Sequence, residues 1–409
     1  MTDSCAAPGL LPLKQALAQI LNALPQPQYY ERLPLKKALR RVTYQDVTSN
    51  INVPSFRNSS MDGYALRSLD HQKDTLNLIG TSWAGKPYTG KINRGECVRI
   101  FTGAYVPDDS DCVVMQENVT RLNESIQINQ WPQSKENIRN IADDTSKGQT
   151  LLTKGRDLNA ADIGLLASCG IADVAVFKQL TVGFFSTGDE LIPIGSQANL
   201  GQIYDSNRYT LHALLEQSGF TPIDMGVIPD NADAVEAALI SASKKCDVII
   251  TTGGVSVGEA DFITDVLGKI GHINLWKIAI KPGKPFVFGS INNASFFGLP
   301  GNPVSVMVSF HNIVLPALKK LMGYSTSQPA ITLQAITTET IIKHPGRMEF
   351  QRGFAENING KLTVKPTGSQ GSHILSSMAK ANCFIVLEQN SSTIDKDQHV
   401  TIQLLDTHL

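Results

Sequence analysis

The sequence lacks the patterns that mark several common classes of protein. Its six cysteines are scattered and form no CxxC pair, which argues against a zinc site or a disulfide framework and favours a reducing cytoplasm. Positive and negative side chains balance to a net charge of −1, so we expect no general binding to nucleic acid. No apolar run is long enough to cross a bilayer, and no basic residues precede an apolar stretch at the N-terminus, so we expect neither a membrane span nor a signal peptide.

The chain is long for a single hydrophobic core, and its pattern changes along its length. Its 409 residues predict two to four domains. Short β-type runs broken by turn residues occupy about 64–145 and 328–409, whereas strands and helices alternate over 180–325. We therefore predict a multidomain α/β protein with these parts: a helical or mixed linking domain in two segments (1–50 and 146–178), an inserted β-rich domain (51–145), a domain with a central, mainly parallel α/β sheet (179–326), and a C-terminal β-barrel-like domain (327–409).

A glycine-rich stretch, TTGGVSVGEAD at 251–261, follows one of the predicted strands. Its glycine spacing approaches a Walker loop, but Glu259 stands where the lysine belongs, and the dinucleotide pattern GxGxxG also fails. The histidines form no HExxH pair and no GxSxG occurs, so zinc and serine hydrolases have little support. The loop alone is compatible with simple strand-to-helix packing, or with backbone N–H groups of residues such as Gly253, Gly254, Ser256 and Gly258 facing a phosphate.

Carboxylates follow several strands of the same predicted sheet or open the helices beside them. They are Glu190, Asp205, Asp230, Glu259 and Asp261. Each one alone is an ordinary helix cap or first-turn residue. Gathered at one sheet edge, however, they repel one another unless a cation lies among them, and oxygen ligands beside backbone amides suit Mg²⁺ with a phosphate-bearing ligand.

Positive charge comes one strand later, in WKIAIKPGKP at 276–285. Lys277 and Lys281 point the same way on an extended strand, and the prolines stiffen the segment that carries Lys281 and Lys284. These lysines are either solvated or placed to bind an oxyanion. Further on, Gly301, Asn302 and Pro303 open a long predicted helix whose first N–H groups face any anion there.

Ten motifs together closely resemble the molybdopterin molybdenumtransferase family, of the MoeA type, and the related gephyrin E domain. In family order and across nearly the whole chain they read NSSMDGYA, RIFTGAYVP, VVMQE, FSTGDEL, IYDSN, TTGGVSVGEADF, WKIAIKPGKPF, GLPGNPVS, FQRG and GSHILSS. The resemblance implies a molybdopterin-binding α/β domain. It also implies an enzyme that takes adenylylated molybdopterin, releases AMP with help from Mg²⁺, and inserts molybdate to give the molybdenum cofactor.

The resemblance also implies roles for individual residues. Asp230 and Asp261 would hold Mg²⁺, and activity is associated with Asp62, Thr102, Asp144 and Glu190 as well. The molybdate pocket would consist of Lys281, Lys284, Pro285, Arg352 and Ser372. Substrate or phosphate would contact Gly253, Gly254, Ser256, Gly258, Lys277, Gly301, Asn302 and Pro303. The family is dimeric, so we expect a cytoplasmic homodimer in which the loop with Asp62 reaches the partner's cleft. Candidate partners are a molybdopterin adenylyltransferase and proteins that mature molybdoenzymes.

One loop departs from the family pattern. Relatives commonly read NIRRxGED where this chain has NIRNIADD at 137–144, so that Ala142 replaces a glycine while Asp144 keeps its place. This departure favours one alternative function, a molybdopterin-binding scaffold without catalysis. A second alternative is a molybdopterin adenylyltransferase, since residues 180–325 alone resemble that fold; the β domains and the lysine, FQRG and GSH motifs argue against it.

Overall fold

The computed structural model describes residues 9–254, 262–325 and 331–405. Its contacts divide the chain into two compact units. Unit 1 comprises Met1–Glu31, Arg40–Tyr44 and Phe177–Leu409, and unit 2 comprises Arg32–Leu39 and Gln45–Val176. The four predicted domain boundaries stay predictions, but the helix near the N-terminus packs in unit 1, with the α/β domain. None of the helices within the described ranges is long and apolar enough to span a membrane.

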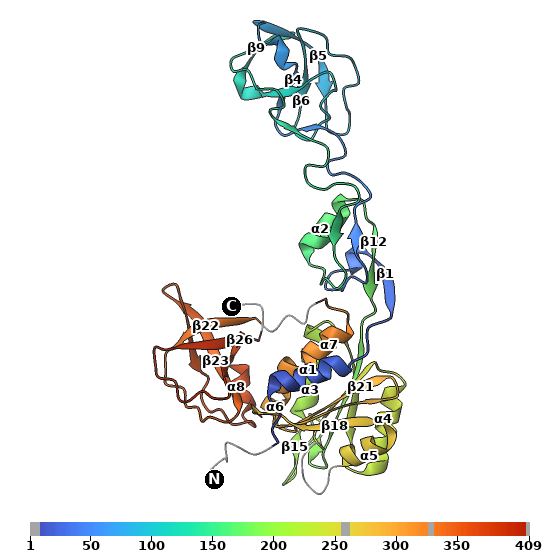
Figure 1. The fold of residues 1–409 in the computed structure, drawn as a ribbon, viewed down its shortest axis with the longest axis vertical. Helices are drawn as coiled ribbons and strands as arrows, with labels where there is room; N and C mark the ends of the chain where they lie inside the picture. Colours follow the sequence, from blue (N-terminus) through green and yellow to red (C-terminus); the bar gives the residue numbers. More distant parts are fainter. Residues whose placement is uncertain (1–8, 255–261, 326–330, 406–409) are drawn as a thin grey trace. The chain divides into compact units, whose positions relative to one another are not determined.

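The central sheet of unit 1 confirms the predicted, mainly parallel α/β domain (Figure 1). Its strand order is β16 (Thr221–Ile228), β13 (Thr181–Thr187), β17 (Val248–Thr252), β21 (Ala294–Leu299), β20 (Pro285–Ile291) and β18 (His272–Lys277). The first four strands are parallel, whereas β20 and β18 continue the sheet antiparallel. The parallel strands bring several loops to one edge because their carboxyl ends share that edge.

Helices cover both faces of this sheet, as the continuous burial of its central strands requires. On β17, Val248 and Ile250 join one core, and Ile249 joins the other. The first face packs on α1 (Leu13–Ala23), α3 (Ser206–Gln217), α6 (Pro303–Ser309) and α7 (Leu315–Leu321), and the second on α4 (Ala232–Ser243) and α5 (Phe262–Ile270) (Figure 1). The long helix predicted from 302 is interrupted by a π turn (Phe310–Val314) just before Pro316, which has no N–H to donate to the preceding turn.

The C-terminal part of unit 1 is a closed five-stranded barrel. Its ladder runs β23 (Met348–Ile358), β24 (Lys361–Pro366), β22 (Thr332–Thr337), β26 (His399–Leu404) and β25 (Cys383–Leu387), and β25 pairs back with β23. Asn359–Gly360, a residue pair typical of tight hairpin turns, joins β23 to β24, and Ile358 pairs with Lys361 across it. The short strand β19 (Ile280–Lys281) pairs in parallel with β23 and so joins the lysine segment to the barrel.

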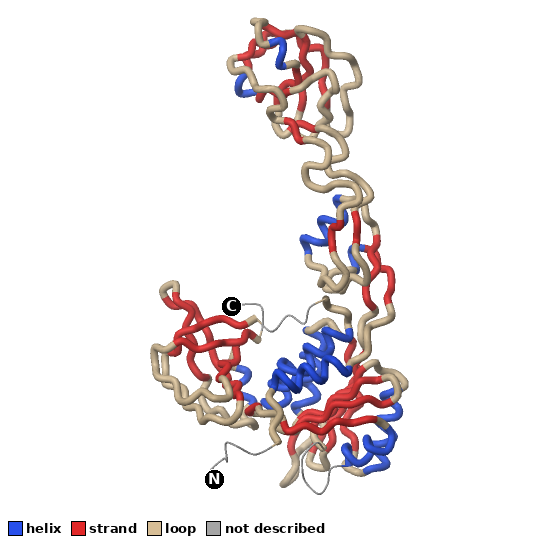
Figure 2. The backbone as a smooth tube through the Cα atoms, in the orientation of Figure 1, coloured by secondary structure: helices blue, strands red, loops and turns tan. Residues whose placement is uncertain are grey.

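Unit 2 holds the predicted β-rich insertion, which Figure 2 shows as strands and loops with short helical turns. Its open sheet has the order β7 (Cys112–Met115), β4 (Gly63–Leu66), β6 (Glu96–Ile100), β5 (Thr75–Ser82), β9 (Ser125–Ile128) and β8 (Val119–Leu122). The rest of this unit includes two small ladders, β3 (Asn58–Ser59) with β10 (Ile138–Arg139) and β2 (Val47–Thr48) with β11 (Thr150–Leu152). Its helix α2 (Ala160–Ser168) begins at a capping box between Asn159 and Asp162. β1 (Tyr30–Pro34) pairs with β12 (Asp173–Phe177), and the sequence boundaries of the two units, after Glu31 and after Val176, fall within these two strands. In unit 1, β14 (Leu191–Ile192) pairs with β15 (Ile203–Tyr204).

Candidate functional site

A cavity of about 570 Å³ opens in unit 1 where four separate loops meet: the loops after β17 and β21, the lysine segment and a barrel loop. Eight of the residues predicted for substrate or molybdate line it: Gly253, Gly254, Lys281, Lys284, Pro285, Gly301, Asn302 and Ser372. Pro282, Gly283, Pro300, Ser305, Arg347, Gln370 and Gly371 complete the lining. The loops at the carboxyl end of the parallel strands, the lysine segment and a barrel loop therefore form one site, although about 120 residues separate the first from the last.

The glycines after β17 are required by close packing at the sheet edge. Gly253 has φ +85°, and a Cβ atom there would lie 2.6 Å from the carbonyl oxygen of Thr187. Gly301 approaches the same place from the loop after β21, and its carbonyl accepts a hydrogen bond of 2.7 Å from the amide of Asn207. Glycine is required at position 253 by its φ angle and by Thr187, whereas a Cβ atom at Gly301 would make only an ordinary contact of 3.8 Å with Gly253; both backbones lie at the cavity wall.

The lysine segment reaches the cavity through its pairing with the barrel. Ile280 pairs with Met348, and the amide nitrogen of Ile278 donates to the carbonyl of Lys284 across the turn. Lys281 lies 3.4 Å from the nearly buried carboxylate of Glu349, and Lys284 is exposed. Two ammonium groups and one partly compensating carboxylate thus give this wall a positive charge, which suits an oxyanion.

Arg352 takes a different place from the one its predicted role suggests. Its side chain is 1% exposed and does not belong to the cavity lining. The guanidinium donates to the carbonyls of Ser369 and Gly371 and to the hydroxyl of Ser377, at 3.0 to 3.2 Å. Burial lowers the pKa of Arg352 to about 10.

The surrounding bonds tie the same loop down further. The backbone of Arg352 exchanges two hydrogen bonds with the side chain of Gln370, and the carbonyl of Ser372 accepts from the amide nitrogen of Val304 at the start of α6. Arg352 therefore holds the loop that presents Gln370, Gly371 and Ser372. The arginine that lines the cavity is Arg347, just before β23. No motif marks Arg347 in the sequence; its position follows from the pairing of β19 with β23.

Carboxylates meet at the end of β13 and β16. The backbone N–H of Asp230 donates to the carboxylate of Asp189, and burial together with the charges of Asp189 and Glu190 raises the pKa of Asp230. One carboxylate oxygen of Asp230 is buried and has no hydrogen-bond partner in the part of the chain that the structure describes. Asp205, by contrast, caps α3 and pairs with Arg208, so its ordinary structural role accounts for it.

A cation fits the unsatisfied oxygen and the mutual repulsion of this acidic cluster. Elsewhere at this sheet edge, Thr187 beside Gly253 and Asn207 beside Gly301 have buried side-chain oxygens that lack a partner among the described residues. No group of three acidic, histidine or cysteine side chains within the described ranges has the geometry of a metal site. Mg²⁺ commonly binds through one or two carboxylates, keeps waters and binds substrate phosphates; Asp261, the other predicted ligand, lies outside the described residues.

Unit 2 contributes a separate polar pair. The carboxylate of Asp62 accepts hydrogen bonds from the backbone N–H and the hydroxyl of Thr102, at 2.7 and 2.8 Å, and these bonds lower the pKa of Asp62. Arg99 adds a nearby positive charge, and its guanidinium donates to the carbonyl of Gly63. Asp62, which is half-buried, is consequently ionised and fixed in orientation.

The loop with Asp144 shows what the departure from the family pattern does to the backbone. Ala142 has φ +65°, a left-handed conformation that glycine adopts without strain and alanine does not. The loop is nevertheless held, because Ala142 donates to the carbonyl of Pro54 and Asp144 to that of Val53. Asp144 keeps an exposed position in unit 2.

Several predicted residues lie elsewhere. Lys277 ends β18 and Pro303 begins α6, and neither belongs to the cavity lining. Lys277 and Lys281 are not on one strand, because β18 ends before a tight turn in which Ile280 donates to the carbonyl of Ile278. Ser256, Gly258, Glu259 and Asp261 lie outside the described residues.

Comparisons with known proteins agree along the chain. Residues 11–170 match the "MoeA N-terminal region (domain I and II)", residues 183–320 the "Probable molybdopterin binding domain", and residues 334–405 the "MoeA C-terminal region (domain IV)". A molybdopterin molybdenumtransferase of Haemophilus influenzae is 47% identical over 96% of this chain and 98% of its own length. Gephyrin of Dictyostelium discoideum is 33% identical over 92% of this chain and 59% of its own length.

A solved structure agrees as well. The molybdopterin biosynthesis MoeA protein of Pyrococcus horikoshii OT3 superposes with a TM-score of 0.83 at 29% identity, covering 97% of this chain and 100% of that one. The ten motifs, the fold and these comparisons lead to one conclusion: the chain belongs to the MoeA family of molybdopterin molybdenumtransferases, which is related to gephyrin.

Proposed function

We propose that the cavity of unit 1 binds molybdate beside the phosphate end of adenylylated molybdopterin, and that this enzyme releases AMP and inserts the metal into the dithiolene. Cleavage of the pyrophosphate bond takes up one water, and the two dithiolene thiols together displace one oxygen of molybdate, which leaves as water with their two protons. The observation that carries the proposal is the joint lining of one cavity by Lys281, Lys284 and the barrel loop with Ser372.

Several groups contribute to this reaction in different ways. The lysines neutralise the dianion, and the backbone at Gly253 and Gly301 approaches phosphate without side-chain obstruction. Arg352 keeps the loop with Ser372 in place, so the oxyanion meets donors that need no rearrangement. The Asp62 carboxylate, held ionised by Thr102, can orient or accept a proton.

Mg²⁺ is part of the proposal, with Asp230 and Asp261 as its ligands and Glu190 beside it. The unsatisfied buried oxygen of Asp230 supports this assignment. The ion supplies positive charge that stabilises the departing phosphate of AMP. Asp261 lies outside the described residues, so its share rests on the motif alone.

The direct test mixes the purified protein with adenylylated molybdopterin, Mg²⁺ and molybdate, and measures AMP. We expect AMP release that depends on molybdate and is lost in Lys284→Ala. If the ligand binds but no AMP appears, the scaffold alternative, which the altered loop at 139–143 favours, replaces this proposal.

We further propose a cytoplasmic homodimer in which Asp62 of one subunit serves the cavity of the other. The test mixes two inactive variants, Asp62→Asn and Lys284→Ala. If subunits share sites, mixed dimers contain one intact site, and random mixing restores about a quarter of the wild-type activity. If each site uses its own Asp62, mixing restores none. A molybdopterin adenylyltransferase and molybdoenzyme-maturation proteins remain the proposed partners.

A further inference from the structure

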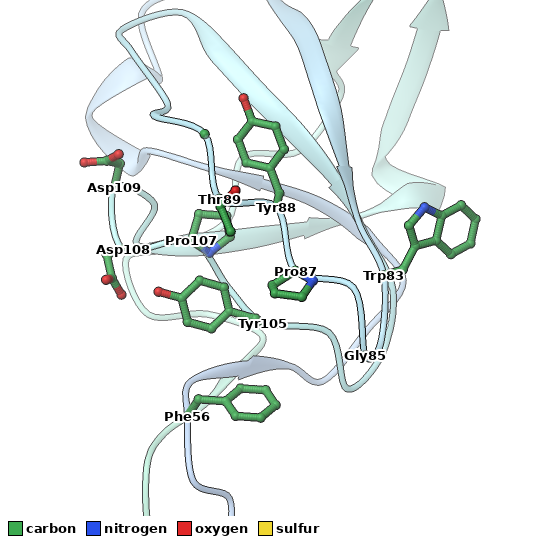
Figure 3. Close-up of a pocket in the computed structure, with 11 residues that line it drawn as sticks. Phe56, Trp83, Gly85, Pro87, Tyr88, Thr89, Tyr105, Pro107, Asp108 and Asp109 are labelled. Carbon is green, nitrogen blue, oxygen red and sulfur yellow. The ribbon is translucent and has the colours of Figure 1, made fainter.

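A second pocket lies wholly within the inserted β-rich part of unit 2 (Figure 3). Its volume is about 570 Å³, and the described residues that line it include aromatic rings, prolines and two carboxylates but no lysine or arginine. In Figure 3 the rings of Phe56, Tyr105 and Pro87 lie near one another, and Asp108 and Asp109 stand together on one side. None of the residues predicted for the active site lines this pocket, so unit 2 alone defines it.

Hydrogen bonds between three separate segments build the pocket in advance of any ligand. Arg57 donates to the carbonyls of Pro107 and Ser110, both at 3.2 Å. The hydroxyl of Ser82 donates to the carbonyl of Tyr105 at 2.8 Å. A pocket whose walls are already in place loses little conformational freedom when it binds, which favours a specific ligand.

Glycines on both sides of one ring keep another wall in position. A Cβ atom at Gly80 would lie 2.5 Å from a ring carbon of Tyr88, and one at Gly90 would lie 2.4 Å from the Tyr88 hydroxyl. A side chain at either position would therefore collide with this ring. The close packing fixes the loop that carries Pro87 and Thr89.

Large aromatic rings at this pocket remain open to solvent. Phe56 is 42% exposed and meets the Tyr105 ring edge-on, with centroids 6.1 Å apart. Trp83 is 52% exposed although it stacks on Phe101, with centroids 4.3 Å apart. Rigid, exposed rings of this kind bury apolar groups of a partner at a low cost in side-chain entropy.

The charge at the pocket is negative. The side chain of Asp108 is 86% exposed, with Arg57 3.9 Å away, and its hydrogen bond with Tyr105 raises the pKa of that phenol. Asp109 is also exposed and accepts the backbone N–H of Ile92. Two carboxylates at one side repel the phosphates of a nucleic acid or an anionic lipid, and they attract the side chains of arginine and lysine.

An extended ligand with apolar rings and a cationic group matches both features. Proline-rich segments form a polyproline II helix before they bind, and they dock into grooves lined by aromatic side chains. This helix has three residues per turn and rises about 3.1 Å per residue, so every third residue returns to the same face about 9 Å further along. A compact organic cation matches less well, because Asp108 is exposed at the edge of the pocket and not enclosed by the rings.

We propose that this pocket is a docking site for a proline-rich segment of a partner protein that also carries arginine or lysine. Prolines of the segment pack on Phe56, Pro87 and Tyr105, and its cationic side chain pairs with Asp108 and Asp109. The inference goes beyond the function proposed above and does not depend on it, because it uses unit 2 alone.

The test measures the fluorescence anisotropy of a labelled synthetic peptide of three Arg-Pro-Pro repeats, titrated with the full-length protein. We expect saturable binding with a Kd on the order of 0.1 mM, which weakens as salt is added. Two control peptides separate the contributions: one carries glutamate in place of each arginine, and the other carries serine in place of each proline. Each control peptide should bind at least about tenfold more weakly.

Variants of the protein locate the binding. Phe56→Ala and Asp108→Asn change the pocket, and each should weaken binding at least about fivefold. Leu122→Ala and Asp74→Asn are matched controls, because Leu122 is 43% exposed against 42% for Phe56, and Asp74 is an exposed aspartate of the same unit. Both control variants should bind the peptide as the wild type does.

Four results would overturn the inference. They are the absence of saturable binding, equal binding by pocket variants and control variants, undiminished affinity of the serine peptide, and displacement of the peptide by tetramethylammonium at similar concentrations. The third result would leave only a general attraction between charges. The fourth would identify the pocket as a site for a small organic cation.

Discussion

Two cavities of about 570 Å³ differ in nearly every other property. The cavity of unit 1 is lined by glycine backbone, prolines, two lysines and an arginine, and it lies where parallel strands end. The pocket of unit 2 is lined by aromatic rings with carboxylates on one side, on an open sheet that is largely antiparallel. A positive cavity suits an oxyanion and phosphate, whereas an aromatic, acidic one suits proline rings beside a cationic side chain.

The difference shows that volume alone does not identify a site. The comparison also separates residues that line a cavity from residues that position other groups through hydrogen bonds. Arg347 and Lys284 belong to the first kind, and Arg352 and Thr102 to the second.

The largest effect is expected at the buried arginine. Arg352→Ala leaves three acceptors unpaired inside the protein, so we expect a loss of about 3 kcal/mol in the free energy of unfolding and AMP release reduced about a hundredfold. Urea unfolding and the activity assay measure both. A variant of normal stability that merely needs more molybdate would make Arg352 a direct ligand and contradict its assignment as a positioning residue.

Lys284→Ala removes an exposed ammonium group from the cavity. We expect AMP release at low molybdate to fall about a hundredfold, while stability stays within about 0.5 kcal/mol, because no packing is lost. Lys277→Ala is the matched control: it removes the same group from a residue outside the cavity lining, so its activity should stay near the wild-type value. Equal losses in both variants would show that general positive charge matters more than the cavity.

Thr102 offers a graded test in unit 2. Thr102→Val keeps the backbone N–H bond to Asp62 but loses the hydroxyl bond, which raises the pKa of Asp62 toward its ordinary value. The acid limb of the rate profile should therefore move to higher pH. At neutral pH Asp62 stays ionised in both proteins, so the loss of about tenfold expected there comes from the looser orientation of its carboxylate. Thr102→Ser keeps both donors and should restore the wild-type profile. A profile unaltered by valine would remove Asp62 from the titrating step.

The smallest effect is expected in thermal stability at the acidic cluster. Because burial and neighbouring carboxylates raise the pKa of Asp230 above 3.8, the folded protein binds its proton more tightly than the unfolded chain does. The stability that this group contributes is present below pH 3.8 and is lost as the pH rises through the folded pKa. Asparagine stays uncharged at neutral pH, so Asp230→Asn should raise Tm by a few degrees there in EDTA. Mg²⁺ should then raise the Tm of the wild type more than that of the variant. The same response to Mg²⁺ in both proteins would place the ion elsewhere.

Much of the fold follows from local patterns in the sequence. The apolar run TVGFFST coincides with β13. Asn159 is of a residue type that favours the N-cap position it occupies in α2, and Asn359–Gly360 is a residue pair typical of the hairpin turn that it forms. Each of these features depends on a few adjacent residues, so it can be predicted directly from the sequence. The shared cavity lining was also predictable in part, because parallel strands bring their following loops to one edge.

Other features depend on contacts between distant segments. Arg352 and Arg347 differ by five positions, yet only the pairing of β23 with β19 and β25 decides which one is buried and which one lines the cavity. The run from Lys277 to Lys281 reads as one strand, but a tight turn divides it. The aromatic pocket joins Phe56, Tyr88 and Tyr105 from three loops and carries no motif that points to it.

Molybdate itself gives the most direct test of the central claim, that the lysine-lined cavity of unit 1 is the oxyanion site. Crystals soaked with molybdate and measured near the molybdenum absorption edge reveal the metal by its anomalous scattering. We predict one strong peak between Lys281, Lys284 and Ser372, absent in Lys284→Ala. A peak in the unit 2 pocket, or at another surface with this cavity empty, would contradict the account.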